Sequence, residues 1–248
     1  MQDISLLPIL LLPLIAWLYA NVGHGGASGY LAILALSGLS IEFLRPSAWM
    51  MNLVVSGTAF VAFYRAGYFK ASLLKPFIIA SVPMAFMAGS FEINPSLYKI
   101  LLGSCLALAT LRIWFGLYFE SKPMESGKPP TLWAGLLAGA VIGGISGLIG
   151  IGGGILLSPL ILFMGWGTVK EAAAVAAVFI FINSFAGLTG HFISQGITVH
   201  AQLPLWLLLV IIGGYFGAGQ GSRIFSELAV RRILGVVLAL ASIKLIFF

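Results

Sequence analysis

The chain has 248 residues, of which 60% are hydrophobic and only 8% are charged, and its formal net charge is +6. Soluble domains carry about 25% charged residues, so this composition excludes a soluble globular protein and favours a polytopic membrane protein. The basic excess is typical of cytoplasmic loops and does not indicate nucleic-acid binding. The single cysteine, Cys105, can form neither an internal disulfide nor a cysteine metal cluster. We therefore expect no metal and no cofactor.

Ten apolar segments, five in each half of the chain, are predicted to be helices. The first of them lacks the basic region and cleavage site of a signal peptide, so it is predicted to stay in the membrane. The second segment of each half has only 12 or 13 residues, which at about 1.5 Å per residue is shorter than a hydrocarbon core of ~30 Å. The predicted segments are 5–21, 27–38, 47–63, 72–90, 97–119, 132–148, 153–165, 172–193, 203–221 and 229–247.

The two halves are related in sequence. The stretch "LLGSCLALATLRI" (101–113) aligns without gaps to "ILGVVLALASIKL" (233–245). We therefore predict two transmembrane repeats, 1–119 and 131–248, joined by a polar cytoplasmic linker at 120–130. Three pairs of glycines also align: Gly23 with Gly150, Gly25 with Gly152, and Gly26 with Gly153.

The distribution of Lys and Arg predicts the topology. If all ten segments cross, ten basic residues fall on one side and only Arg45, Lys99 and Lys244 on the other. If the two short segments do not cross, the split is seven to six. The positive-inside rule therefore favours ten crossings, with both termini outside and the linker inside. Five crossings per half turn the second half upside down, which predicts an inverted repeat typical of secondary transporters.

A glycine-rich break precedes each short segment, at 23–26 and 150–154. A short helix that reaches one surface must begin inside the membrane, where irregular backbone is tolerated only if protein or a water-filled cavity surrounds it. The first N–H groups of such a helix are unpaired and carry partial positive charge, which suits an anion. We expect the two helix starts to meet near the midplane and bind one small anion. The candidate substrate-binding residues are His24, Gly25, Gly26, Ala27, Ser28, Asn52, Gly152, Gly153, Gly154 and Asn183.

Each candidate also has a purely structural interpretation. Glycines in membrane helices permit close packing, although two aligned clusters before short helices favour a binding site. Asn52 and Asn183 lie in the third segment of each half and are interpreted as walls of the site, with interhelical hydrogen bonding as the alternative. His24 has no counterpart, because Ile151 occupies the aligned position. It is a candidate for substrate contact or proton transfer, or it bonds a backbone carbonyl.

The stretches "GLIGIGGGILLSPLIL" and "GHGGASGYLAIL" resemble the two glycine motifs of the TauE/SafE (TSUP) family of sulfite-exporter-like permeases, and the similarity covers essentially the whole chain. The resemblance implies a multi-pass transporter of the cell membrane that moves sulfur-containing anions such as sulfite, sulfonates or thiosulfate. The partners it implies are this small anion and the lipid bilayer, with homo-oligomerisation left open. The family is often described with seven or eight spans, which differs from ten unless the short helices are not counted.

Two other functions were considered. "GGASG" (25–29) contains the Gly-x-Ser-Gly pattern of rhomboid intramembrane proteases, in which Ser28 would be the nucleophile and His191 the base. However, the residue aligned with Ser28 is Ile155, so the duplication preserved the glycines and not the nucleophile, and we do not expect an enzyme. An anion channel would need rings of polar or charged side chains along a pore, and no such ring is visible in the sequence.

Overall fold

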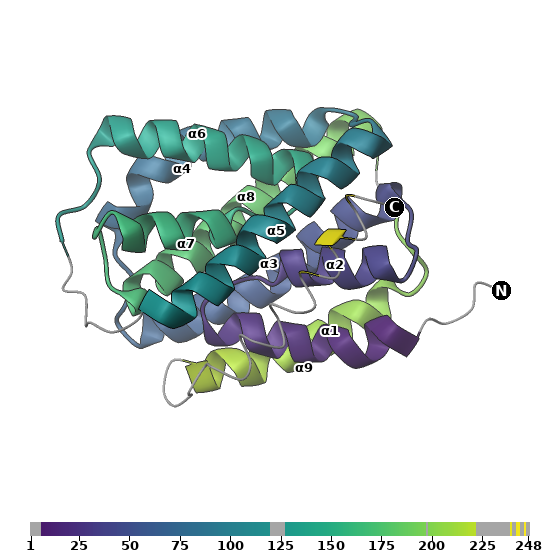
Figure 1. Ribbon diagram of the computed structural model, residues 1–248, viewed down its shortest axis with the longest axis horizontal. Helices are drawn as coiled ribbons and strands as arrows, with labels where there is room; N and C mark the ends of the chain where they lie inside the picture. The colour runs from purple at the N-terminus through teal and green to yellow at the C-terminus, as the bar shows by residue number, and fades with distance from the viewer. Residues whose placement is uncertain are drawn as a thin grey trace.

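The computed structural model describes residues 6–119, 127–196 and 198–221, together with 239, 242, 243 and 246 near the C-terminus. The described residues form helices and no strand (Figure 1). The helices are α1 (Leu6–Asn21), α2 (Ala27–Leu36), α3 (Ile41–Arg65), α4 (Ala71–Ser90), α5 (Pro95–Phe119), α6 (Leu132–Ile149), α7 (Gly154–Phe163), α8 (Val169–Gln195) and α9 (Leu203–Gly221).

The prediction of an all-helical membrane protein is confirmed. Within the described residues, α3, α4, α6, α8 and α9 each contain a stretch long and apolar enough to cross a membrane. The two predicted short segments are helices α2 and α7, of 10 residues each. The tenth predicted segment, 229–247, lies almost entirely outside the described residues.

Two helices begin three or more residues earlier than predicted, for different reasons. Helix α3 begins at Ile41 and not at 47, because Arg45 is buried inside it with its guanidinium bonded to backbone carbonyls. Helix α8 begins at Val169 and not at 172, because Thr168 and Glu171 form a capping box before the apolar run. In both cases a polar residue that makes hydrogen bonds belongs to the helix, although hydropathy alone places it outside.

The helices pair reciprocally between the two halves. Figure 1 shows α4 beside α6 along one edge and α1 beside α9 along the opposite edge, with α3 and α8 between them. The first helix of each half therefore packs against the fourth helix of the other half. This pairing is what two related halves packed about a pseudo-two-fold axis would produce. The inverted orientation of the halves stays a prediction.

Glycines allow these outer pairs to approach closely. On α6, a Cβ at Gly139 or Gly143 would collide with a backbone carbonyl of α4, and on α9 a Cβ at Gly213 or Gly217 would collide with one of α1. Small residues four apart are the usual means by which membrane helices bring their backbones together. Part of the glycine content therefore serves packing, away from the two glycine-rich breaks.

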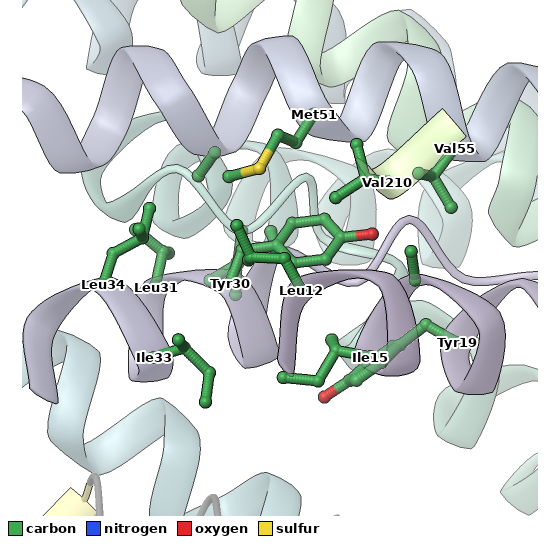
Figure 2. Packing of buried hydrophobic residues seen from close by; sticks show 14 of the residues in the cluster. Leu12, Ile15, Tyr19, Tyr30, Leu31, Ile33, Leu34, Met51, Val55 and Val210 are labelled. Atoms are coloured by element: carbon green, nitrogen blue, oxygen red, sulfur yellow. The ribbon is translucent and has the colours of Figure 1, made fainter. Parts of the chain in front are cut away.

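Helix α2 lies in the interior of the protein. Its residues from Ala27 to Leu34 are all buried, and Figure 2 shows Tyr30, Leu31, Ile33 and Leu34 among side chains of α1, α3 and α9. The break before α2 is thus surrounded by protein, which is the condition under which irregular backbone is tolerated at membrane depth. The neighbours labelled in Figure 2 are Leu12, Ile15 and Tyr19 of α1, Met51 and Val55 of α3, and Val210 of α9.

Candidate functional site

Helices α2 and α7 begin in the same way. Each follows a glycine in the left-handed conformation, Gly26 with φ 91° and Gly153 with φ 80°. Because the residue before each helix is a glycine, it has no side chain that could cap the helix start. Glycine adopts this conformation without the strain that a Cβ would cause. A Cβ at Gly26 would lie 2.6 Å from the Tyr30 ring, and one at Gly153 would lie 2.8 Å from Phe179. These two aligned glycines therefore shape the turns and lie against aromatic side chains.

The neighbouring aligned pair, Gly25 and Gly152, lies on either side of the same two side chains. A Cβ at Gly25 would collide with the Asn52 amide oxygen and would lie 2.9 Å from Ile180 Cγ2. A Cβ at Gly152 would lie 2.7 Å from Asn52 Nδ2 and 2.8 Å from the same Ile180 methyl group. The structure thus brings Gly25, Gly152 and Asn52 together, and it adds Ile180 between the two turns.

Both ends of the Asn52 amide are hydrogen-bonded. The residue is fully buried, its Oδ1 accepts the N–H of Ala27 at 3.1 Å, and its Nδ2 donates to Ser184 Oγ at 3.2 Å. Ala27 is the first residue of α2, so its N–H is one of the donors that a helix start leaves unpaired. Asn52 of α3 therefore caps α2 from a neighbouring helix, and its oxygen occupies the position at which we expected an anion oxygen.

The start of α7 is covered by an apolar side chain. A Cβ at Gly154 would lie 2.5 Å from Ile180 Cγ1, so Ile180 packs directly on the first residue of that helix. The two helix starts thus differ, one facing an amide and the other an isoleucine. Ile180 and Ser184 are four residues apart and lie on one face of α8, and neither was predicted from the sequence to belong to the site. An isoleucine and a serine in an apolar helix carry no signal of a site.

Two other candidates lie against α1. Ser28 Oγ is 2.6 Å from Tyr19 OH, and both atoms are buried. His24 Nδ1 is 2.9 Å from the Val22 carbonyl, and its ring lies edge-on to Tyr19. Ser28 and His24 therefore share Tyr19 as a neighbour. Among the described residues no hydrogen bond joins Ser28 to His191, whose ring packs against Trp49, so the pair that a rhomboid-like protease would need is not assembled here.

Asn183 is fully buried, but its bond lies within its own helix. Its Nδ2 donates to the Phe179 carbonyl one turn earlier at 2.9 Å, and its Oδ1 has no partner in the described part of the chain. Asn183 precedes Ser184, yet no hydrogen bond in residues 6–119, 127–196 and 198–221 connects it to Asn52. Its role as a wall of the site stays a prediction. The described residues bring no three His, Cys, Asp or Glu side chains together in a group that could hold a metal ion.

Comparison with known proteins identifies the family to which the sequence is similar. The family model described as "Sulfite exporter TauE/SafE" matches residues 9–245. "Probable membrane transporter protein y4hK" of Sinorhizobium fredii is 38% identical over 234 residues, which are 94% of each chain. "Probable membrane transporter protein MamO" of Magnetospirillum gryphiswaldense is 28% identical over 87% of this chain and 40% of its own length. No solved structure matches.

The apolar helices of the described region and these relatives agree on a multi-pass membrane protein that carries a small substrate through the lipid bilayer. The match of the family model extends from the start of α1 to beyond the last described helix, and the y4hK relative is similar over nearly its full length. The chain therefore belongs to the sulfite exporter TauE/SafE family.

Proposed function

We propose that the protein is a secondary transporter of a small sulfur-containing anion, a sulfite or a sulfonate, which binds between the two glycine turns. The observation that carries this proposal is the position of the Asn52 amide between Gly25 and Gly152, in contact with the start of α2. The sulfur-containing class is supported by the description of the family. The anionic charge is supported by the chemistry of the site.

The site offers neutral donors. The backbone N–H groups at the starts of α2 and α7 carry the partial positive charge of a helix N-terminus, and the Asn52 amide adds N–H groups without a full charge. At the midplane, where we place this site, a fixed cation would be especially costly to bury and would hold an anion strongly. Neutral donors bind an anion weakly enough for release, which a transporter requires.

In the described conformation Asn52 and Ile180 lie against both turns, so binding of an anion there requires these side chains to move. Binding then exchanges one acceptor for another. The Asn52 oxygen leaves the Ala27 N–H, an anion oxygen takes its place, and rotation of the amide directs its N–H groups to the anion. The Ala27 N–H keeps a partner throughout, so no buried donor is left unpaired.

Reciprocal helix packing supports alternating access. The third helices of the two halves, α3 and α8, supply Asn52 and Ser184 and meet at the centre, while α4–α6 and α1–α9 lie on the two edges. In transporters built from inverted repeats, a central site at the repeat interface is exposed alternately to the two sides. We place the substrate at the α3–α8 interface for this reason.

Counterflow in proteoliposomes tests the proposed function. Vesicles that contain the purified full-length protein are loaded with unlabelled methanesulfonate and diluted into radiolabelled methanesulfonate. A carrier accumulates label transiently above its external concentration, because internal unlabelled substrate drives exchange. Passive flux without this overshoot identifies a channel. Equal uptake by protein-free vesicles, for both methanesulfonate and sulfite, excludes the proposed substrate class.

A further inference from the structure

Arg45 is a buried cation in α3. Its side chain is almost inaccessible, with the residue 3% exposed. The guanidinium donates to the carbonyl of Phe91 at 3.2 Å, of Gly89 at 3.1 Å and of Gly147 at 3.0 Å. These carbonyls belong to the C-terminal ends of α4 and α6, where the helix dipole is negative. Arg45 thus ties α3 to the ends of two neighbouring helices.

The charge of Arg45 has no carboxylate partner in residues 6–119, 127–196 and 198–221. The ion pair found in those residues joins Lys70 to Glu171. Carbonyl dipoles compensate a full positive charge only in part, and a buried charge without a counter-charge is strongly unfavourable. A small anion beside the guanidinium would supply the missing negative charge.

Three buried polar atoms around Arg45 lack hydrogen-bond partners in the described part of the chain: Arg45 Nε, Trp49 Nε1 and His191 Nδ1. They belong to one cluster. The guanidinium carbon is 5.1 Å from the centre of the Trp49 ring, and that ring is 5.6 Å from the His191 ring. Buried polar atoms nearly always have partners, so the unpartnered N–H groups of Arg45 and Trp49 in this cluster point to a ligand. A water molecule would satisfy the hydrogen bonds but not the charge.

The cluster is aligned with the proposed site. Arg45, Trp49 and Asn52 are spaced four and three residues apart, which places them on one face of α3. On α8, His191 follows Ser184 by seven residues, which is two turns on the same face. The Trp49–His191 contact and the Asn52–Ser184 bond show that these two faces meet. Arg45 lies about 10 Å along the helix axis from Asn52.

We propose that Arg45 and Trp49, with His191 packed against the indole ring, form a second anion-binding site, the outer site, for a monovalent oxyanion such as a sulfonate. This inference rests on the proposed function, because it makes the cluster a second position of the transported anion on the α3–α8 interface. The Nε–H of Arg45 and the Nε1–H of Trp49 donate to the anion. The single guanidinium charge matches one negative charge, so the outer site selects monoanions over neutral solutes.

Trp49→Phe tests the outer site, because it keeps an aromatic ring and removes the indole N–H together with part of the ring volume, a loss of volume that the control below shares. Binding of methanesulfonate to the purified full-length protein is titrated in the Asn52→Ala background, which weakens the central site. We expect residual binding that Trp49→Phe weakens about tenfold or more, the effect of one lost charge-assisted hydrogen bond. Trp206→Phe is the matched control, since Trp206 is also buried, also has an unpartnered Nε1, and stacks on His200 instead of Arg45. It should leave binding unchanged.

The titrations distinguish a failure of the outer site from a failure of the proposed function. Residual binding that is unchanged by Trp49→Phe, or weakened equally by Trp206→Phe, overturns the outer site, and so does the absence of residual binding in the Asn52→Ala background. The proposed function stands in these cases if the wild-type protein binds methanesulfonate. If the wild-type protein binds no sulfonate or sulfite, the proposed function itself fails. Should Asn52→Ala not fold, the same comparison is made in the Gly25→Ala background.

Discussion

Asn52 donates its amide N–H to the hydroxyl of Ser184 across 3.2 Å, and the two buried residues are 132 positions apart in the chain. One belongs to the third helix of the first half and the other to the third helix of the second half. Because the Asn52 oxygen also accepts the first N–H of α2, this one side chain connects both halves and a helix start at the level of the two glycine turns. The proposed binding of an anion between the glycine turns depends on this position of Asn52.

Asn52→Ala should weaken anion binding and also lower stability, by similar free energies. We expect methanesulfonate affinity to fall roughly 10- to 150-fold, because one charge-assisted hydrogen bond contributes about 1.5–3 kcal/mol. The free energy of unfolding should fall by about 1–3 kcal/mol, since the Ala27 N–H and the Ser184 hydroxyl lose their partner. Isothermal titration and thermal unfolding of the purified protein measure the two effects. Lower stability with wild-type affinity would show that the amide only connects helices.

Asn183→Ala tests whether the second asparagine also contacts the substrate. The variant removes a bond within α8, so its melting temperature should change little. If the Asn183 oxygen or amide lines the substrate path, affinity falls at least about tenfold, as we predict. Unchanged affinity in the same titration would remove Asn183 from the site.

Cysteine labelling tests the topology. In a Cys105→Ser background, Lys128→Cys should be modified only from the cytoplasmic side and Glu92→Cys only from outside, because the positive-inside rule places the linker inside and the loop before α5 outside. Both positions are exposed. Modification of both by an impermeant maleimide added to intact cells would contradict the model of five crossings in each half.

Two adjacent glycines of α6 test the packing against α4. A Cβ at Gly143 would collide with the Ser81 carbonyl, whereas one at Gly144 would lie 3.6 Å from the end of the Met84 side chain, an ordinary contact. Gly143→Ala should therefore lower the free energy of unfolding by about 1–3 kcal/mol, as overpacking does. Gly144→Ala should leave the thermal unfolding transition nearly unchanged. Equal melting temperatures for the two variants would show that the α4–α6 contact is looser than described.

The helices could be predicted from the sequence where hydropathy and glycine spacing specify them. Nine of the ten predicted segments correspond to the helices of the described residues, because apolar length is what the bilayer demands. The starts of α3 and α8 were misplaced, since the bonds of Arg45 and of the capping box at Thr168 depend on neighbours that hydropathy does not consider.

The composition of the site was less predictable. Gly25, Gly152 and Asn52 were predicted to lie near one another because aligned glycines and an intramembrane amide are unusual, and the structure brings them together. Ile180 could not be predicted, because an isoleucine between two turns has the same sequence signature as any core residue. The cluster around Arg45 was missed for a related reason. Its three members lie on two helices that are far apart in the sequence, and only tertiary packing brings them together.

Gly25→Ala provides the most direct test of the claim that the glycine turns bind the anion. The φ of Gly25 lies outside the left-handed region, so alanine can adopt the same backbone conformation. The added methyl group would displace the Asn52 amide. Gly57→Ala is the control, because its Cβ would lie 3.6 Å from the Phe181 ring. We predict that equilibrium binding of methanesulfonate to folded Gly25→Ala is at least about tenfold weaker than to Gly57→Ala and wild type. Equal affinity in all three proteins would contradict the account.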